Sequence, residues 1–229
     1  MLKNVDAVLF DCGETLVTLK PSREEIFVRA AKSIGVDLRQ ESVRRAYQLV
    51  DFGNKYSSVN VRERNDFYRT YNRQLCDALG IAVCFEELHP TLSALFERET
   101  QWALVDGAQE LLAELDRRKL KLGLVANWDR NLGALAEGLG VRHYFDIVVP
   151  SEEVGVEKPD PGIFRIALDQ LRMSRSPERV LYVGNEYRAD VIGSRSAGLT
   201  PVLIDCPDLY PHADCLRFRS LRDFQQAIM

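Results

Sequence analysis

VDAVLFDCGETL, residues 5–16, joins a short apolar run to an acidic turn. Runs such as Val5–Phe10 are typical of strands that are buried in a parallel sheet. Asp11 ends the run, and the turn at Gly13 can project the Asp11 carboxylate into a crevice. By itself Asp11 also fits an ordinary turn residue, so the rest of the chain must decide between the two interpretations.

Similar apolar runs return along the chain, with room for a helix between them. Further strands are predicted at Leu120–Val125, Phe145–Val149, Val180–Val183 and Pro201–Ile204, with a weaker edge strand at Cys215–Phe218. Helix start signals lie at Asp106 before Ala108–Arg118, at Asp129 before a helix ending near Gly138–Gly140, and at Asp160-Pro161. This alternation predicts an α/β fold, with a doubly wound parallel sheet and a Rossmann-like core.

The stretch from about Ser22 to Trp102 shows helical patterns and no convincing strand. Ser22 and Glu25 have the spacing of a capping box, and helical patterns continue to Ile34 and then through Glu41–Leu49, Arg64–Leu79 and Phe85–Leu104. We therefore expect residues 1–17 and 105–229 to form a catalytic core and residues 18–104 to form an inserted all-helical cap. Residues 51–64 are the most polar part of the insert and are predicted to be a loop that faces the bound molecule.

The composition is that of a soluble globular protein, with 229 residues, 46% apolar and 28% charged. A net charge of -4, spread along the chain, gives no case for nucleic acid or an anionic membrane as a partner. No apolar run is long enough to span a bilayer. The five cysteines include no CxxC pair and no secretory leader is evident, so we expect a cytoplasmic location.

Polar stretches follow four of the predicted strands, at the sheet edge where α/β proteins bind ligands. They are FDCGETL (10–16), ANWD (126–129), VEKPDPG (156–162) and GNEYRAD (184–190). The amides at Ala126 and Asn127 precede a helix and suit an anion. The rigid Lys-Pro-Asp-Pro frame would hold the Lys158 ammonium in one place, as charge neutralisation requires. Side-chain oxygens at Asn185 and Asp190 could hold a hard cation such as Mg²⁺.

In order and spacing, these stretches resemble the motifs of the haloacid dehalogenase (HAD) superfamily, over almost the whole chain. The resemblance implies that Asp11 is a nucleophile that forms a covalent aspartyl intermediate, which water then hydrolyses. It also implies that Lys158 neutralises the carboxylate and the transferred group. The implied phosphate-binding residues are Ala126, Asn127 and Lys158, and the implied Mg²⁺ ligands are Asp11, Gly13, Asn185 and Asp190.

The chain departs from the family pattern at three positions. Gly13 stands where phosphatases carry a second aspartate, the acid and base of the reaction, whose loss typically costs ~10²–10⁴-fold in rate. Ala126 replaces a Ser or Thr hydroxyl, and Asn185 replaces an aspartate at the cation site.

Neighbouring carboxylates could compensate for two of these changes. Glu14 could partly serve as the acid, because a carboxyl close to Asp11 should have a raised pKa, or it could simply point to solvent. Glu186 could restore charge beside Asn185.

The expected function is that of a weak or unusual Mg²⁺-dependent phosphatase, a hydrolase of small phosphorylated metabolites that works through an aspartyl-phosphate on Asp11. One alternative is metal-independent dehalogenation of a 2-haloacid on the same aspartate. Another is a catalytically silent relative that binds a phosphorylated ligand or a protein partner, because Gly13, Ala126 and Asn185 replace usual catalytic residues. The identity of the substrate and the oligomeric state are left open.

Overall fold

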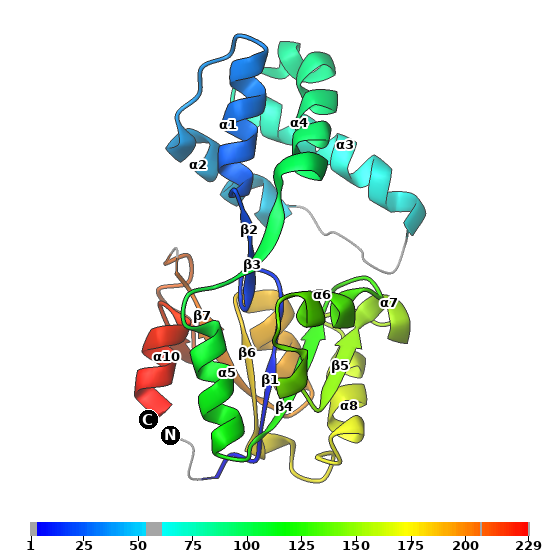
Figure 1. Ribbon diagram of the computed structural model, residues 1–229, viewed down its shortest axis with the longest axis vertical. Coiled ribbons are helices and arrows are strands. Elements are labelled where there is room, and N and C mark those ends of the chain that lie inside the picture. Colours follow the sequence, from blue (N-terminus) through cyan, green and yellow to red (C-terminus); the bar gives the residue numbers. More distant parts are fainter. Residues whose placement is uncertain (1–3, 54–60, 207, 229) are drawn as a thin grey trace. The chain divides into compact units, whose positions relative to one another are not determined.

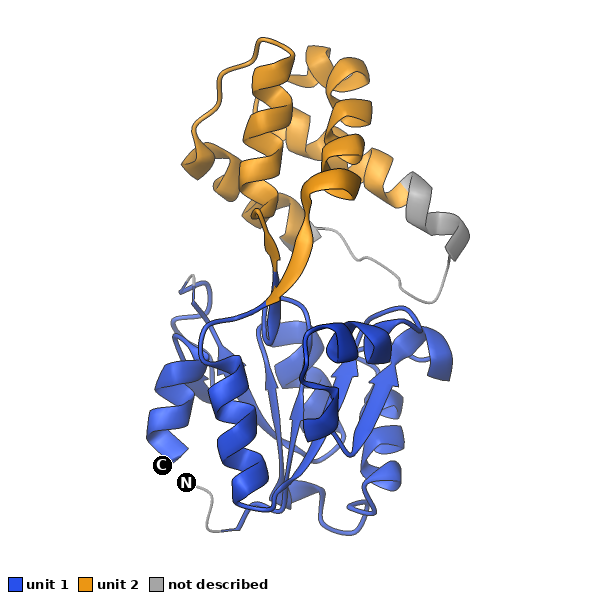
Figure 2. Cartoon of the chain, in the orientation of Figure 1, with its two compact units in different colours: residues 1–18, 104–229 blue, residues 19–103 orange. Residues whose placement is uncertain are grey.

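The computed structural model describes residues 4–53, 61–206 and 208–228, with the backbone alone described at 52, 53 and 61–66. The chain divides into two compact units (Figure 2). One consists of residues 1–18 and 104–229, and the other of residues 19–103.

A six-stranded parallel sheet, in the order β5-β4-β1-β6-β7-β8, forms the centre of the first unit (Figure 1). Its strands are β1 (Ala7–Phe10), β4 (Lys121–Ala126), β5 (Ile147–Pro150), β6 (Val180–Gly184), β7 (Thr200–Ile204) and β8 (Leu216–Phe218). Phe10 pairs with Leu124 on one side and with Val183 on the other, so β1, β4 and β6 end at the same edge of the sheet, where β4 runs two residues and β6 one residue further than β1. The strand order reverses around β1, and such a switch point opens a crevice at the carboxyl ends.

Helices cover both faces of this sheet, with α5 and α10 on one face and α8 on the other (Figure 1). The helices are α5 (Ala108–Arg117), α6 (Leu132–Gly138), α7 (Ser151–Val154), α8 (Pro161–Gln170), α9 (Gly193–Ser196) and α10 (Leu221–Ile228), with helical turns η2 (Arg142–Tyr144), η3 (Pro177–Arg179) and η4 (Tyr187–Ile192). Ile163 and Phe164 of α8 pack in one buried cluster with Leu9 and Tyr182. The predicted doubly wound sheet and its six strands are confirmed.

The predicted capping residues are confirmed at one helix and wrong at two, although α5 begins at Ala108 as predicted. Asp160 caps α8, its side chain accepting a hydrogen bond from the Gly162 amide, with Pro161 in the first turn. Asp106 does not cap α5. Gly107 precedes that helix with φ +82°, and the Asp106 carboxylate instead accepts two hydrogen bonds from Arg222.

Asp129 also lies outside its expected helix. Its carboxylate accepts a hydrogen bond from the Asn131 amide, and α6 begins only at Leu132. An aspartate that bonds a backbone amide two residues ahead stabilises a turn in place of a helix cap.

Helices form almost all of the second unit, in agreement with the predicted helical insert. They are α1 (Arg23–Ser33), α2 (Gln40–Gly53), α3 (Val61–Ala78) and α4 (Phe85–Glu99), with the turn η1 (Ala82–Cys84). The capping box of α1 is present, with reciprocal bonds between Ser22 and Glu25. Phe27, Leu75 and Leu92 lie in a shared buried core. In the described residues no helix combines the length and the apolar character needed to cross a membrane.

The expected loop at 51–64 is wrong at both ends. Residues 51–53 end α2 and residues 61–64 begin α3, while residues 54–60 lie outside the described part of the chain.

A two-stranded sheet replaces the end of the expected helix Phe85–Leu104. Helix α4 ends at Glu99, and β3 (Gln101–Leu104) pairs with β2 (Val17–Lys20). Thr100 has extended backbone angles, and its hydroxyl donates to the Phe96 carbonyl at 2.6 Å, satisfying a carbonyl of the last turn. The insert is therefore bounded by a short sheet where the chain leaves and re-enters the core.

Candidate functional site

A buried lysine joins two carboxylates at the carboxyl edge of the core sheet. The Lys158 ammonium donates to Asp11 Oδ1 at 2.6 Å and to Asp190 Oδ1 at 2.7 Å. Asp11 follows β1, Lys158 follows β5 and α7, and Asp190 lies in η4 after β6. Their exposed fractions are only 7%, 6% and 1%. Residues predicted from three separate stretches therefore meet at one point.

Tyr182 provides a third partner for the same ammonium. Its hydroxyl oxygen accepts from Lys158 Nζ at 3.0 Å, and its O–H donates to the Val125 carbonyl at 2.8 Å. The ring belongs to β6, is fully buried and packs edge-to-face on Phe164. Tyr182 thus links the lysine to the backbone of β4.

Asn127 fixes the backbone of Lys158. Its side-chain nitrogen donates to the Lys158 carbonyl at 3.0 Å, and its side-chain oxygen accepts from the Lys158 amide at 2.7 Å. The side chain of Asn127 thus holds the two loops together, and an anion at this position would have to be bound by backbone groups. Ala126 ends β4 and is buried, and it offers only backbone groups.

Asp190 has a hydrogen bond on each carboxylate oxygen. Oδ1 accepts from Lys158, and Oδ2 accepts from the Glu186 amide at 2.8 Å. The carboxylate lies against Gly184, where an added Cβ would approach its atoms to 2.3 Å. Glycine at 184 is therefore required by close packing on Asp190.

Two carboxylates facing one ammonium leave the cluster with a formal excess of one negative charge. Burial raises the pKa of the Asp11 carboxyl, although Lys158 acts in the opposite direction. Burial alone would lower the pKa of Lys158, but Asp11 and Asp190 outweigh it and raise that pKa well above its ordinary value. The lysine is therefore a permanent positive charge, fixed beside a carboxylate that can act as a nucleophile or as a cation ligand.

The second oxygen of Asp11 faces Thr15 and Asn185. The Thr15 hydroxyl, fully buried, donates to Asp11 Oδ2 at 3.1 Å. One end of the Asn185 amide lies 3.2 Å from Asp11 Oδ2 and 3.2 Å from the Gly13 carbonyl oxygen. We assign the amide nitrogen to that end, because all its neighbours there can accept a hydrogen bond. Asp11, Gly13 and Asn185 are thus gathered around one point.

Glu14 and Glu186 lie differently. The Glu14 carboxylate is exposed and accepts hydrogen bonds from the Thr18 hydroxyl at 3.1 and 3.2 Å. Glu14 has φ +55°, in the left-handed region that non-glycine residues seldom adopt. The Glu186 side chain is exposed, while its backbone amide donates to Asp190 Oδ2 and its carbonyl accepts from the Asp190 amide, both at 2.8 Å.

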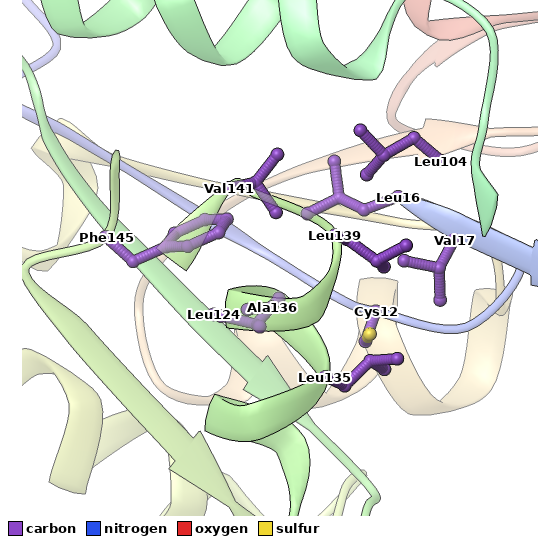
Figure 3. Close-up of a pocket in the computed structure, with 10 residues that line it drawn as sticks. All are labelled: Cys12, Leu16, Val17, Leu104, Leu124, Leu135, Ala136, Leu139, Val141 and Phe145. Atoms are coloured by element: carbon purple, nitrogen blue, oxygen red, sulfur yellow. The ribbon is translucent and has the colours of Figure 1, made fainter. Parts of the chain in front are cut away.

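Cys12 points away from this chemistry, into a small apolar pocket between the loop after β1 and helix α6 (Figure 3). Leu16, Leu124, Leu135 and Phe145 are among the side chains that line it. Burial raises the pKa of the Cys12 thiol far above its ordinary value. Cys12 therefore packs as an apolar side chain.

Sequence reasoning missed two residues of the cluster. Tyr182 lies inside an apolar strand, where a tyrosine is indistinguishable from an ordinary core residue. Thr15 falls in the first polar stretch, four residues after Asp11, and its hydroxyl was the available signal. Within the described ranges, no three His, Cys, Asp or Glu side chains form a group that could hold a metal ion.

Comparisons with known proteins agree with the geometry. A sequence model of the haloacid dehalogenase-like hydrolases matches residues 5–198. The haloacid dehalogenase-like hydrolase domain-containing protein 3 of Homo sapiens is 31% identical over 209 residues, covering 86% of this chain and 81% of the human protein. A ribulose-1,5-bisphosphate 5-phosphatase from Halopiger xanaduensis is 30% identical over 212 residues, covering 87% of this chain and 84% of the archaeal one.

A solved structure shares the fold. The HAD-hydrolase YfnB from Bacillus subtilis, bound to magnesium, aligns with a TM-score of 0.71 at 21% identity and covers 99% of both chains. The family match spans the four polar stretches that supply Asp11, Asn127, Lys158 and Asn185. On this sequence match the resemblance is confirmed, and the chain belongs to the haloacid dehalogenase-like hydrolases.

Proposed function

We propose that this hydrolase is a Mg²⁺-dependent phosphatase of small phosphorylated metabolites, acting through an aspartyl-phosphate on Asp11. The observation that carries the proposal is the buried contact of 2.6 Å between Asp11 Oδ1 and Lys158 Nζ. A carboxylate must lose part of its repulsion for a phosphate dianion before it can attack, and a fixed ammonium provides that. The phosphatase named among the relatives supports the same class of substrate.

Three oxygen atoms at and near Asp11 are suitable ligands for a hard cation. They are a carboxylate oxygen of Asp11, the Gly13 carbonyl and the Asn185 side-chain amide, which can present its oxygen by a half turn. Mg²⁺ prefers such oxygen donors, uses few protein ligands and keeps several waters. The formal excess of negative charge also favours a cation. When bound, Mg²⁺ would supply further neutralisation of the phosphate charge.

Asp190 contributes to this site through its contact with Lys158. It is proposed to hold Lys158 through Oδ1 and to add negative charge beside the cation, and it remains a candidate ligand because each of its oxygens, like those of Asp11, keeps a lone pair.

The proposed reaction has two steps on one carboxylate. An oxygen of Asp11 attacks phosphorus, the bond from phosphorus to the ester oxygen breaks, and the alcohol leaves with a proton. Water then attacks phosphorus, the bond from phosphorus to the Asp11 oxygen breaks and restores the carboxylate, and inorganic phosphate leaves while the proton lost by the water passes to solvent. Main-chain amides at Ala126 and Asn127 are proposed to hold the phosphate oxygens, and residues 18–104 are proposed to act as the cap that selects the substrate.

The site has no acidic side chain at position 13 to protonate the leaving group, because that residue is glycine. Glu14 remains the proposed partial substitute, and it would have to leave its hydrogen bonds with Thr18 to act. Unchanged turnover in Glu14→Gln would remove Glu14 from the mechanism and leave water as the proton donor.

One assay tests the function. Phosphate release is measured on a panel of phosphate esters and halide release on 2-haloacids, each with Mg²⁺ or with EDTA. We expect Mg²⁺-dependent phosphate release that is abolished in Asp11→Asn. Asp116→Asn, at an exposed position of α5, is the matched control and should keep full activity.

Two results would contradict the proposal. Halide release in the presence of EDTA would replace phosphatase chemistry by dehalogenation on the same aspartate. No release of either product, together with a rise in melting temperature on adding a phosphate ester, would indicate a binding protein.

A further inference from the structure

We infer that the preferred substrates of this site are acyl phosphates, the mixed anhydrides of a carboxylic acid and phosphate. This substrate class narrows the phosphatase function proposed above and rests on it. Its basis is that the described residues around Asp11 neutralise negative charge but offer the leaving group no acid.

The two residues after Asp11 bring no acidic side chain to its carboxylate. Cys12 points into the apolar pocket (Figure 3). Gly13 has no side chain, and a Cβ built there would lie 3.5 Å from Cζ3 of the Trp128 ring. The space beside Gly13 therefore borders an aromatic ring.

Glu14 carries the next carboxyl group along the chain, and this group is held in an exposed turn. Its oxygens accept hydrogen bonds from the Thr18 hydroxyl at 3.1 and 3.2 Å. The Glu14 amide donates to the Val17 carbonyl at 2.7 Å, so the backbone of the turn is held as well. To protonate a leaving group beside Asp11, Glu14 would first have to give up its contact with Thr18.

In the described part of the chain, the side chains that contact the Asp11 carboxylate are those of Lys158, Thr15 and Asn185. The Thr15 hydroxyl gives its single proton to Asp11 Oδ2 at 3.1 Å. None of the three is a carboxyl or an imidazole, the groups that commonly donate a proton to a leaving group near neutral pH. Asp190, the other carboxylate of the cluster, accepts hydrogen bonds on both oxygens.

The chemistry of the leaving group decides which substrates such a site cleaves quickly. A phosphate ester expels an alkoxide, the base of an alcohol whose pKa is about 15, close to that of water, and a general acid typically contributes ~10²–10⁴-fold to such a step. An acyl phosphate expels a carboxylate, the base of an acid whose pKa is about 4, and needs no proton. Acyl phosphates therefore lose least from the lack of an acid beside Asp11.

With an acyl phosphate, the first step balances without a proton donor. An oxygen of Asp11 forms a bond to phosphorus, the bond from phosphorus to the acyl oxygen breaks, and its electron pair leaves on a carboxylate. Water then attacks phosphorus, the bond to Asp11 breaks, and the proton lost by the water passes to solvent. Because the described side chains in contact with Asp11 include no general base for this second step, phosphorylated Asp11 should accumulate.

Acetyl phosphate and ethyl phosphate are a matched pair of substrates, because one has a carbonyl group where the other has a methylene group. We would measure kcat/KM, which reports the step in which the leaving group departs, with saturating Mg²⁺. We expect Gly13→Asp to raise it ~10²–10⁴-fold for ethyl phosphate and less than about threefold for acetyl phosphate. Gly13→Asn, which has no acidic proton, should keep the wild-type ratio of the two substrates within about threefold.

Two results of this comparison would overturn the inference. One is a ratio of acetyl to ethyl phosphate that is the same in Gly13→Asp and in the wild type. The other is a wild type that cleaves ethyl phosphate as fast as acetyl phosphate. Either result would show that the leaving group already receives a proton, for example from residues 19–103.

A quenched-flow experiment with acetyl phosphate uses the wild type and does not depend on the folding of a Gly13 variant. We expect a burst of acetate close to one equivalent per chain, with a covalent phosphoryl group that intact mass detects and that Asp11→Asn lacks. The absence of a burst at saturating acetyl phosphate would overturn the inference.

Failure of the inference is distinguishable from failure of the proposed function. If the wild type hydrolyses neither acetyl phosphate nor any ester of the panel, the proposed function fails and the acyl preference fails with it. If it hydrolyses both classes with a ratio that Gly13→Asp does not change, the phosphatase function stands and the acyl preference alone is refuted.

Discussion

Gly13→Asp should speed up the phosphatase reaction that we propose for this site. Position 13 has room for the change, because an added Cβ would meet only Trp128 Cζ3, at an ordinary contact distance of 3.5 Å, and Gly13 does not have a positive φ. The carboxyl would stand two residues after Asp11, where family phosphatases carry their acid and base. The expected gain in kcat is ~10²–10⁴-fold, or about 2.7–5.4 kcal/mol of activation free energy.

The same charge should cost stability in the absence of a cation. A third carboxylate roughly 6 Å from Asp11, at an effective dielectric constant of about 20, adds ~3 kcal/mol of repulsion. We therefore expect a lower free energy of unfolding in EDTA and a partial recovery with Mg²⁺.

The assay is steady-state phosphate release with saturating Mg²⁺, on the best ester of the panel. Gly13→Asn is the matched control, since it has the size of aspartate without an acidic proton, and Gly13→Ala controls for the Cβ. A kcat for Gly13→Asp no higher than that for Gly13→Asn would refute the reasoning that the missing acid limits the rate.

Three further predictions concern the neighbourhood of the cluster and the thiols. Gly184→Ala should lower the free energy of unfolding by about 2–4 kcal/mol, because the added methyl group must displace the Asp190 carboxylate. Denaturant titration measures this change, and a loss below about 0.5 kcal/mol would contradict the packing of Gly184 on Asp190. Asn185→Asp adds a negative charge to the cation site and should tighten the Kd for Mg²⁺ about tenfold or more by calorimetry, and an unchanged Kd would argue against a cation there. Burial raises the pKa of the Cys76 thiol to about 11, so iodoacetamide at pH 8 should label the exposed Cys206 before Cys76. Mass spectrometry would measure the two labelling rates, and equal labelling in the folded protein would contradict the burial of Cys76.

The sheet could be predicted because its strands are apolar on both faces. Runs such as Val5–Phe10 and Val180–Val183 have few alternatives to a buried strand once helices are placed between them. The two strands beside the insert were missed for the opposite reason. Val17–Lys20 and Gln101–Leu104 are four residues each, are only partly buried and mix polar with apolar side chains. Nothing local distinguishes them from a helix end.

The convergence of Asp11, Lys158 and Asp190 was also within reach of sequence reasoning, because each follows a strand whose carboxyl end meets the others. Their individual hydrogen bonds were not. The side chain of Asn127 binds the Lys158 backbone across 31 residues of sequence, and Tyr182 contacts the Lys158 ammonium across 24 residues. Both contacts depend on distances between separate chain segments. Such distances arise from packing, which periodicity and spacing do not encode.

The separation of 147 residues between Asp11 and Lys158 has a consequence for biosynthesis. At a translation rate of ~5–20 residues per second, Lys158 is synthesised roughly 7–30 seconds after Asp11. Until then, pairing of β1 into a sheet would bury the Asp11 carboxylate, which follows this strand, without a compensating positive charge. A nascent chain stalled before residue 158 should therefore keep β1 solvated, and closure of the sheet around it should await the emergence of the final third of the polypeptide.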